Sequence, residues 1–126
     1  MNIPDGIKYS VDHEWIKVDG STALIGISDY AQSELGDIVY VDIDSDLSEI
    51  TTNETFGSIE AVKTVSDLYA PITGKVIEIN ERLEDEPELV NSDPYGEGWL
   101  VKIELSDLSQ LEKLLNSEDY KKQIGS

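Results

Sequence analysis

Cysteine is absent from all 126 residues of this chain. Its absence excludes disulfide bonds, cysteine-ligated zinc, iron–sulfur clusters and catalysis by a protein thiol. Histidine is nearly absent, since His13 is the only one, and neither G-x-S-x-G nor H-E-x-x-H occurs. Without those motifs, a nucleophilic-serine triad or a zinc hydrolase has no support. The sequence therefore predicts no catalytic residue and no metal site.

Basic residues are also scarce, because 9 lysines and arginines face 27 aspartates and glutamates, for a formal net charge of -18. Such a polyanion repels phosphate backbones and anionic lipid surfaces, so we expect no nucleic-acid partner and no membrane partner. The charge either serves solubility alone or steers the protein toward basic surfaces of partner enzymes. The sequence has no run of transmembrane length. Residues 1–9 resemble neither a signal nor a transit peptide, which predicts a bacterial-type cytoplasmic location.

Short strands dominate the first two-thirds of the sequence. Residues 14–18 and 22–27 are predicted to form a hairpin around the Asp19-Gly20 turn. A helix over 30–35 is expected, with Asp29 and Gln32 as its capping box and Gly36 as its stop. Further strands are expected at 37–43, 56–62, 65–69, 75–79 and 99–105, loops at 44–53 and 93–98, and a helix start at Pro87 within 84–91.

The C-terminal part of the chain changes to a helical period. Leucines recur at 108, 111, 114 and 115, and Asp107 with Gln110 supplies a second capping box at the start of this segment. Residues 117–124 are expected to add a short helix. Many short strands with helices only at the edges predict a small antiparallel barrel or sandwich with peripheral helices. The length of 126 residues favours a single domain over 1–126.

One lysine lies in an unusual setting. The segments on both sides of Lys63 are rich in β-forming residues, and neither glycine nor proline interrupts them nearby. A tight hairpin with Lys63 near its tip would expose the amine while the strands bury Ile59, Val62 and Val65. A modifying enzyme needs an amine presented on a rigid support. The alternative is that Lys63 is merely one of the eight surface lysines.

The sequence around this lysine resembles the lipoyl-attachment motif of glycine cleavage H proteins, where a lysine after Glu-Ser-Val is followed by Ala-Pro-x-x-Gly. The resemblance extends along most of the chain, through the segments 13–15, 26–32, 35–41 and 89–99. Two features depart from the family pattern: Ala61 replaces the usual serine, and the loop at 44–55 lacks the usual proline and glycine. Biotin carriers and the lipoyl domains of 2-oxo-acid dehydrogenases differ more, because Val62 and Thr64 flank the lysine here.

The resemblance implies a mainly β fold, a small hammerhead or barrel-sandwich hybrid of antiparallel strands with short peripheral and C-terminal helices. Its single lipoyl-binding domain would comprise an N-terminal hairpin and helix, a central lipoyl hairpin, and C-terminal helices at 107–124. Lipoate would be bound covalently to Lys63. The implied function is a non-catalytic carrier that takes an aminomethyl group from the pyridoxal-phosphate glycine decarboxylase to the tetrahydrofolate-dependent aminomethyltransferase. The flavin enzyme dihydrolipoyl dehydrogenase and lipoate-attaching enzymes would be its other partners.

The family resemblance also suggests roles for residues around the lysine. Glu60, Val62 and Thr64 would belong to the attachment site, and Glu60 is predicted to help a lipoylating enzyme recognise it. Glu14 and Asp67 match positions proposed to contact the loaded arm, with Asp12 as a possible helper. Carboxylates there would stabilise a cationic amine by charge-assisted hydrogen bonds. The alternative is that these are three of the 27 solvated acids.

Two other functions remain open from the sequence. A protein of the same fold could relay lipoyl groups to other proteins without serving glycine cleavage. A third possibility is an acidic interaction module that is never modified. Intact mass after exposure to lipoate separates this third function from the other two, and glycine–bicarbonate exchange with a decarboxylase separates the first two from each other.

Overall fold

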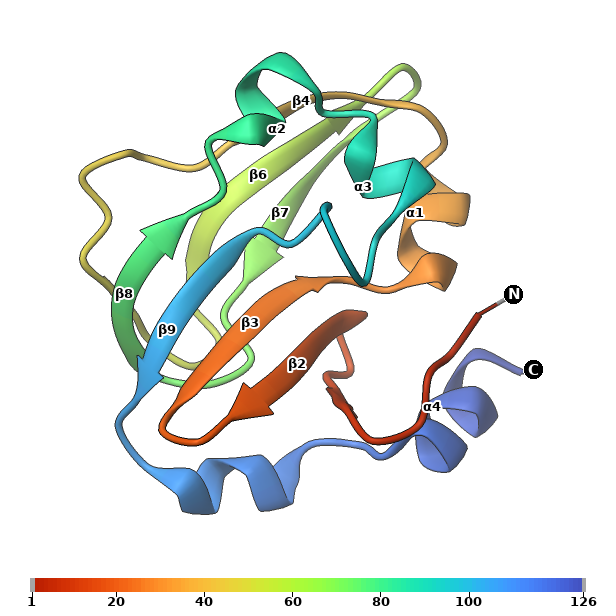
Figure 1. Cartoon of the computed structure of the whole chain (residues 1–126). Coiled ribbons are helices and arrows are strands. Elements are labelled where there is room, and N and C mark those ends of the chain that lie inside the picture. The colour runs from red at the N-terminus through yellow and green to blue at the C-terminus, as the bar shows by residue number, and fades with distance from the viewer. Residues whose placement is uncertain (1, 126) are drawn as a thin grey trace.

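Two antiparallel sheets form the body of the protein in the computed structural model, which describes residues 2–125 (Figure 1). The larger sheet has the order β1-β2-β3-β9-β8-β5, with β1 (Lys8–Tyr9), β2 (Glu14–Asp19), β3 (Thr22–Ile27), β9 (Val101–Leu105), β8 (Gly74–Ile79) and β5 (Glu49–Ile50). The smaller sheet has the order β4-β6-β7, with β4 (Ile38–Asp42), β6 (Thr55–Ala61) and β7 (Val65–Tyr69). These sheets confirm the predicted mainly antiparallel β fold.

The core lies between the inward faces of the two sheets. Ile16 and Ile25 come from the larger sheet, whereas Ile59 and Leu68 come from the smaller one, and all four side chains are buried. Each such side chain contributes about 1.5–3 kcal/mol when it is fully removed from water. Strands from distant parts of the sequence are thereby held together, which places the β6–β7 hairpin beside the N-terminal strands.

The first helix, α1 (Asp29–Leu35), begins one residue earlier than predicted. Its N-cap is Ser28, whose hydroxyl accepts a hydrogen bond from the Ala31 N–H at 3.1 Å. Asp29, predicted as the cap, already lies inside the helix, and its carboxylate accepts from the Gln32 side-chain amide at 2.7 Å. The prediction of Gly36 as the stop is confirmed. Its φ is +84°, a backbone conformation that glycine adopts readily because it has no Cβ atom.

Two segments differ from the sequence predictions. The stretch predicted as a loop at 44–53 contains the short strand β5, which pairs with the start of β8. The acidic stretch around Pro87 holds two one-turn helices, α2 (Arg82–Asp85) and α3 (Leu89–Ser92), rather than one helix starting at the proline. Proline disfavours the helical conformation in the residue before it, which separates the two turns.

The C-terminal segment folds as a 3-10 helix, η1 (Leu108–Lys113), followed by α4 (Ser117–Ile124). Asp107 caps this helix as predicted, since its carboxylate accepts from the Ser109 N–H at 2.9 Å. The predicted capping box does not form, because the Gln110 side-chain oxygen accepts instead from the Thr73 N–H at 2.8 Å. Tyr120 of α4 stacks on Tyr9 of β1 with 4.6 Å between ring centroids, so the two ends of the chain lie together (Figure 1). Within residues 2–125, no helix is both long and apolar enough to cross a membrane.

Candidate functional site

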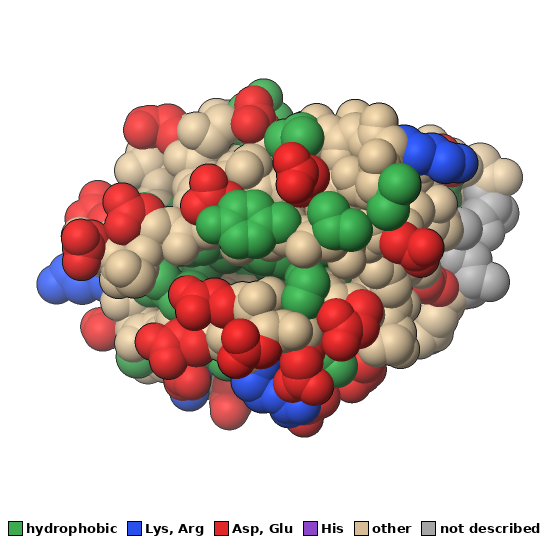
Figure 2. Space-filling model, turned by 90° about the horizontal axis from the view of Figure 1, so that it is seen from above, with side chains coloured by type: hydrophobic (Ala, Val, Ile, Leu, Met, Phe, Trp, Pro, Cys, Tyr) green, Lys and Arg blue, Asp and Glu red, His purple; other side chains and the backbone are tan. Residues whose placement is uncertain are grey.

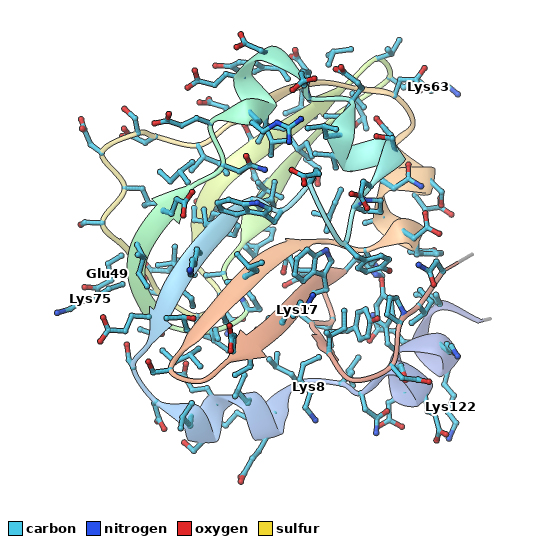
Figure 3. All side chains as sticks on the ribbon, viewed as in Figure 1. Lys8, Lys17, Glu49, Lys63, Lys75 and Lys122 are labelled. Carbon is cyan, nitrogen blue, oxygen red and sulfur yellow. The ribbon has the colours of Figure 1, made fainter. Side chains whose placement is uncertain are left out.

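Lys63 lies at the tip of the β6–β7 hairpin, as the sequence predicted. The Ala61 N–H donates to the Thr64 carbonyl at 2.8 Å, which leaves only Val62 and Lys63 between the bonded residues. The Val62 N–H donates to the Asp37 carbonyl at 3.1 Å, so the turn is also held against the start of β4. Figure 3 shows the Lys63 side chain extending away from the body of the protein. The hairpin therefore presents an exposed amine on a braced turn.

The apolar neighbours of Lys63 do not lie as the sequence predicted. Ile59 is buried, but Val62 is 71% exposed and Val65 is 60% exposed. The register explains the error, because Val65 is the direct partner of Glu60, and cross-strand partners share one face of a sheet. That face points to solvent, whereas the core covers only the side occupied by Ile59. Glu60, Val62 and Thr64 are therefore all exposed around the lysine.

Two ion pairs form near α2, and neither involves Lys63. Among residues 2–125, Arg82 alone forms ion pairs, at 2.5 Å with Glu97 and 3.2 Å with Glu86. The Lys63 amine is therefore not held by a carboxylate of the described chain, and it is accessible for modification.

A pocket of about 240 Å³ lies where α1, β7 and the turn before β2 meet. It brings together Glu14, Asp67 and Asp12, three acids that are far apart in the sequence. The turn supplies Asp12 and the first residue of β2 is Glu14, while β7, the strand that follows Lys63, supplies Asp67. Other lining side chains come mainly from α1 and the smaller sheet, and include Tyr30, Glu34, Leu35, Ile59 and Ser66.

Glu14 is the buried acid of this pocket, with only 2% of its surface exposed. The Ser10 hydroxyl donates to Glu14 Oε1 at 2.8 Å, whereas Asp12 and Asp67 remain exposed. Burial raises the pKa of Glu14 to about 8, and the Ser10 hydrogen bond partly opposes this rise. Burial therefore favours the protonated carboxyl group, and a cation that enters the pocket would favour the ionised one.

His13 lines the same pocket and connects it to the C-terminal helix. Its Nδ1 lies 2.9 Å from the Tyr120 hydroxyl, which in turn lies 2.6 Å from the Ser28 hydroxyl. Burial lowers the pKa of His13, although Asp12 and Glu34 oppose that effect. His13 therefore has a structural role, since it holds the turn that leads into Glu14. Its lowered pKa favours the neutral imidazole in the pocket.

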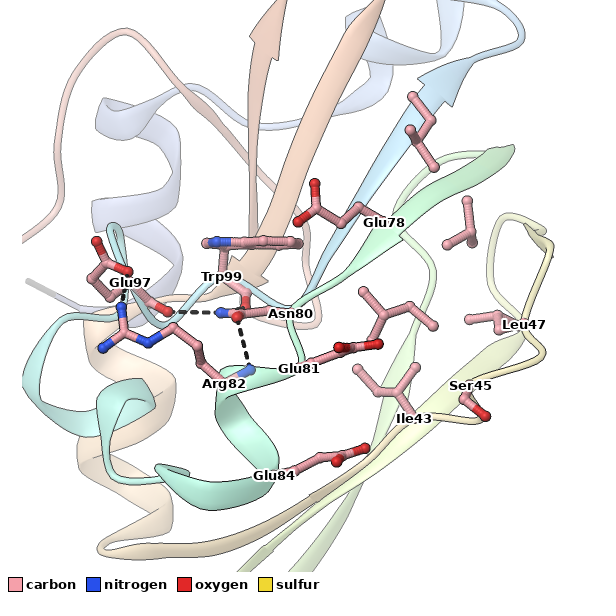
Figure 4. Close-up of a pocket in the computed structure, with 13 residues that line it drawn as sticks. Ile43, Ser45, Leu47, Glu78, Asn80, Glu81, Arg82, Glu84, Glu97 and Trp99 are labelled. Carbon is pink, nitrogen blue, oxygen red and sulfur yellow. Dashed lines mark hydrogen bonds and ion pairs between the residues drawn. The ribbon is translucent and has the colours of Figure 1, made fainter.

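A second hollow, of about 590 Å³, lies beside β8 and the loop after β4 (Figure 4). Its walls carry several apolar side chains and the acids Glu78, Glu81, Glu84 and Glu97. Arg82 and Glu97 form an ion pair at one end of it, and the Asn80 side-chain amide donates to two backbone carbonyls nearby. None of the residues predicted from the sequence as site residues lines this hollow.

Comparison with known proteins identifies the family of this chain. Residues 7–126 match the model of the glycine cleavage H-protein family. This chain belongs to the glycine cleavage H-protein family. It is also similar to the crystal structure of a glycine cleavage system H protein from Mycobacterium marinum, at 35% sequence identity and a TM-score of 0.88. That match covers 98% of this chain and 100% of the other.

Membership of the H-protein family confirms the predicted function. The chain is a lipoyl carrier of glycine cleavage, and it is a carrier protein rather than an enzyme. Proteins of this family typically carry a lipoyl-lysine and work with the other proteins of the glycine cleavage system. The H-protein fold also accounts for the antiparallel sheets with short peripheral helices.

Sequence reasoning missed two residues of the site in this H-protein family member. Ser10 was not singled out, because a serine four residues before a glutamate gives no sign that a turn will fold the two together. No local motif places His13 on the pocket wall, because its ring is held there by Tyr120, which is 107 residues away. Only the tertiary fold reveals contacts over such separations.

Proposed function

We propose that Lys63 is the residue of this chain to which lipoate is attached. The observation that carries the proposal is its exposed amine on a short turn braced against β4. The amine fits the group, because it has no ion-pair partner among residues 2–125 and no bulky side chain of the core surrounds it. A rigid support with a free amine is what a modifying enzyme requires.

Glu60, Val62 and Thr64 form the surface that a lipoate-attaching enzyme would meet around Lys63. All three are exposed, and Glu60 lies beside Tyr40 and Val65 on the outer face of the smaller sheet. Ala61, where the family usually has serine, points inward and is buried. The departure at position 61 therefore lies on the core side of the strand, away from this surface.

The pocket of Glu14, Asp67 and Asp12 is proposed as the place where the carried amine is protected. Asp67 lies four residues beyond Lys63 along β7, about 13 Å at the usual rise of a strand. A flexible arm that starts at the hairpin tip can therefore fold back along this strand. When bound, lipoate supplies a dithiolane whose sulfur accepts the aminomethyl group.

The chain contributes binding and charge at this pocket rather than chemistry. Entry of a cationic amine favours the ionised form of Glu14, so the carboxyl group releases its proton and forms a charge-assisted hydrogen bond. The exposed carboxylates Asp12 and Asp67 add negative charge at the rim. The neutral form of His13 avoids repulsion of the amine. Together these groups would lower the rate at which the carried aminomethyl group is hydrolysed.

The partners follow from the proposed carrier role. They are the glycine decarboxylase, the aminomethyltransferase, the dihydrolipoyl dehydrogenase and a lipoate-attaching enzyme. The end of the molecule at the hairpin shows acidic side chains around a band of hydrophobic ones, next to a hollow (Figure 2). With a net charge of -18, this surface would favour docking on enzymes whose active-site entrances have basic rims.

The attachment site is tested by Lys63→Arg, with Lys75→Arg as a matched control on another exposed lysine (Figure 3). After incubation with lipoate and an attaching enzyme, the wild type and the Lys75 variant should gain one lipoyl group in intact mass. The Lys63 variant should gain none, because the guanidinium group of arginine does not form the amide. A lipoyl group on the Lys63 variant would refute the assignment.

The carrier role is tested by glycine–bicarbonate exchange with a purified glycine decarboxylase. The lipoylated wild type should support exchange, and a protein that accepts lipoate yet supports none would instead be a lipoate relay. The pocket is tested by Glu14→Gln, whose side chain keeps the shape of glutamate but does not ionise. This variant should accept lipoate normally, but its carried aminomethyl group should be hydrolysed faster than that of the wild type. An unchanged rate of hydrolysis would argue against the pocket.

A further inference from the structure

We propose that Ser10 is a positioning residue that aims the Glu14 carboxyl group into the pocket and stabilises its ionised form through the hydroxyl hydrogen bond. The role deepens the proposed function, since it depends on Glu14 receiving the carried amine. Ser10 does not line the pocket itself and would act only through Glu14.

The contact between Ser10 and Glu14 is reciprocal. The Ser10 hydroxyl donates to Glu14 Oε1 at 2.8 Å and accepts from the Glu14 backbone N–H at 3.1 Å. The Ser10 N–H also donates to the Glu14 carbonyl at 2.8 Å. Three hydrogen bonds thus join the two residues, and Ser10 is only 5% exposed. Burial excludes competing water, so the hydroxyl has a fixed direction toward the carboxyl group.

The turn between the two residues is itself held in place. His13 has a φ of +71°, which is uncommon for a residue with a side chain, and its N–H donates to the Ser10 carbonyl at 3.1 Å. The His13 carbonyl accepts from the Ser28 N–H at 2.9 Å, and its ring contacts Tyr120. Such a conformation persists only where the surroundings determine it. The hydroxyl of Ser10 is therefore positioned by the fold and not by chance rotation.

The charges around Glu14 make this hydroxyl important. Besides Glu14, three acids line the pocket: Asp12 in the turn, Glu34 on α1 and Asp67 on β7. None of the lining residues is a lysine or arginine. Tyr30, from α1, is the remaining titratable side chain of the wall besides His13. No cation of the pocket wall therefore stabilises the carboxylate before the amine arrives.

Two interactions favour ionisation of Glu14 against burial and the charge of Asp12. They are the Ser10 hydroxyl and, to a smaller extent, the backbone of Tyr69, and both lower the pKa. Without the hydroxyl, Glu14 would keep its proton to higher pH and bind a cationic amine less well. The inferred effect of Ser10 is thus to keep the carboxyl group within reach of ionisation at the pH where the carrier works.

The first test needs neither lipoate nor a partner enzyme. The Glu14 side chain can be titrated by NMR in the unmodified protein labelled with ¹³C-glutamate. In Ser10→Ala its pKa should rise by about one pH unit, since a hydrogen bond to a charged group has about that effect. Ser10→Thr, which keeps the hydroxyl, should restore the wild-type titration.

Ser117→Ala is the matched control for general loss of packing. Ser117 is 6% exposed and its hydroxyl donates to the Asp5 carboxylate, so this variant removes a comparable contact outside the pocket. Its Glu14 titration should equal that of the wild type. If the Ser10→Ala protein does not fold, Ser10→Cys provides a side chain of similar size with a weak donor and should raise the pKa as well.

The second test uses the lipoylated, amine-loaded protein. In Ser10→Ala, the pH below which the carried amine becomes labile should move upward together with the Glu14 titration, whereas Ser10→Thr should behave like the wild type. An unchanged titration in folded Ser10→Ala, or an equal change in Ser117→Ala, would overturn the inference. If Lys63 does not accept lipoate, the proposed function fails, but the NMR titration still decides the role of Ser10.

Discussion

Replacing Glu14 with glutamine should make the folded protein more stable than the wild type, by a margin that grows as the pH rises. Glu14 is buried and its pKa is raised from 4.5 to about 8, because burial disfavours the charged form. Folding therefore favours the protonated carboxyl group. The stabilisation by that form is complete below pH 4.5 and is lost as the pH rises through 8. Glutamine has a similar shape, does not titrate, and has a carbonyl that can accept from Ser10.

The expected size of this effect follows from the two pKa values. Each pH unit between 4.5 and 8 costs the wild type about 1.4 kcal/mol relative to a group that does not titrate. The glutamine variant should therefore gain nothing at pH 4.5, about 3 kcal/mol at pH 7, and about 5 kcal/mol at pH 9. Such a gain is large compared with a typical total stability of 5–15 kcal/mol.

Urea denaturation followed by tryptophan fluorescence measures this difference, because Trp15 is fully buried. The free energies of unfolding of wild type and Glu14→Gln should diverge between pH 5 and pH 9. Glu34→Gln, on an exposed acid of the same pocket, is the matched control, and it should change the free energy of unfolding by less than about 0.5 kcal/mol because it is a surface substitution. Parallel curves for Glu14→Gln would refute the reasoning. The same variant is expected to protect the carried amine less well, so stability and function would oppose each other at this residue.

Two further predictions concern packing. Gly26→Ala should cost about 1–3 kcal/mol, because a Cβ at this position would lie 2.6 Å from the buried Trp15 ring, whose Nε1 donates to the Pro94 carbonyl; an unchanged urea midpoint would contradict the close approach. Ile59→Ala should cost about 2–5 kcal/mol, whereas Val62→Ala should change stability by less than about 0.5 kcal/mol. Equal losses in these two variants would contradict their different burial.

Local patterns predicted most of the secondary structure. The hairpin around Asp19-Gly20, the stop at Gly36 and the cap at Asp107 depend on the preferences of a few neighbouring residues, and the structure contains all three. The N-cap at Asp29 was wrong by one residue, because Ser28 offers an equally suitable oxygen one position earlier. Local signals of this kind indicate that an element exists better than they indicate where it begins.

The burial of residues near the hairpin tip could not be predicted from alternation alone. Val62 and Val65 are apolar, but the turn shifts the phase between the two strands and the core does not extend to the tip. Which strand lies beside which is also a matter of long-range pairing. β5 is a strand because Glu49 and Ile50 pair with the start of β8, and two residues are too few to show a strand's alternating pattern.

By itself, the sequence determined the lysine on a hairpin, the mainly β class and the family resemblance, because these depend on short motifs and on the order of residue types. The tertiary structure alone decided that Glu14 is buried while Asp12 and Asp67 stay exposed around one pocket. It also decided that Ser10 contacts Glu14. The physical reason is that a carboxyl group's solvation, and hence its proton affinity, depends on every segment packed around it, and those segments come from distant parts of the chain.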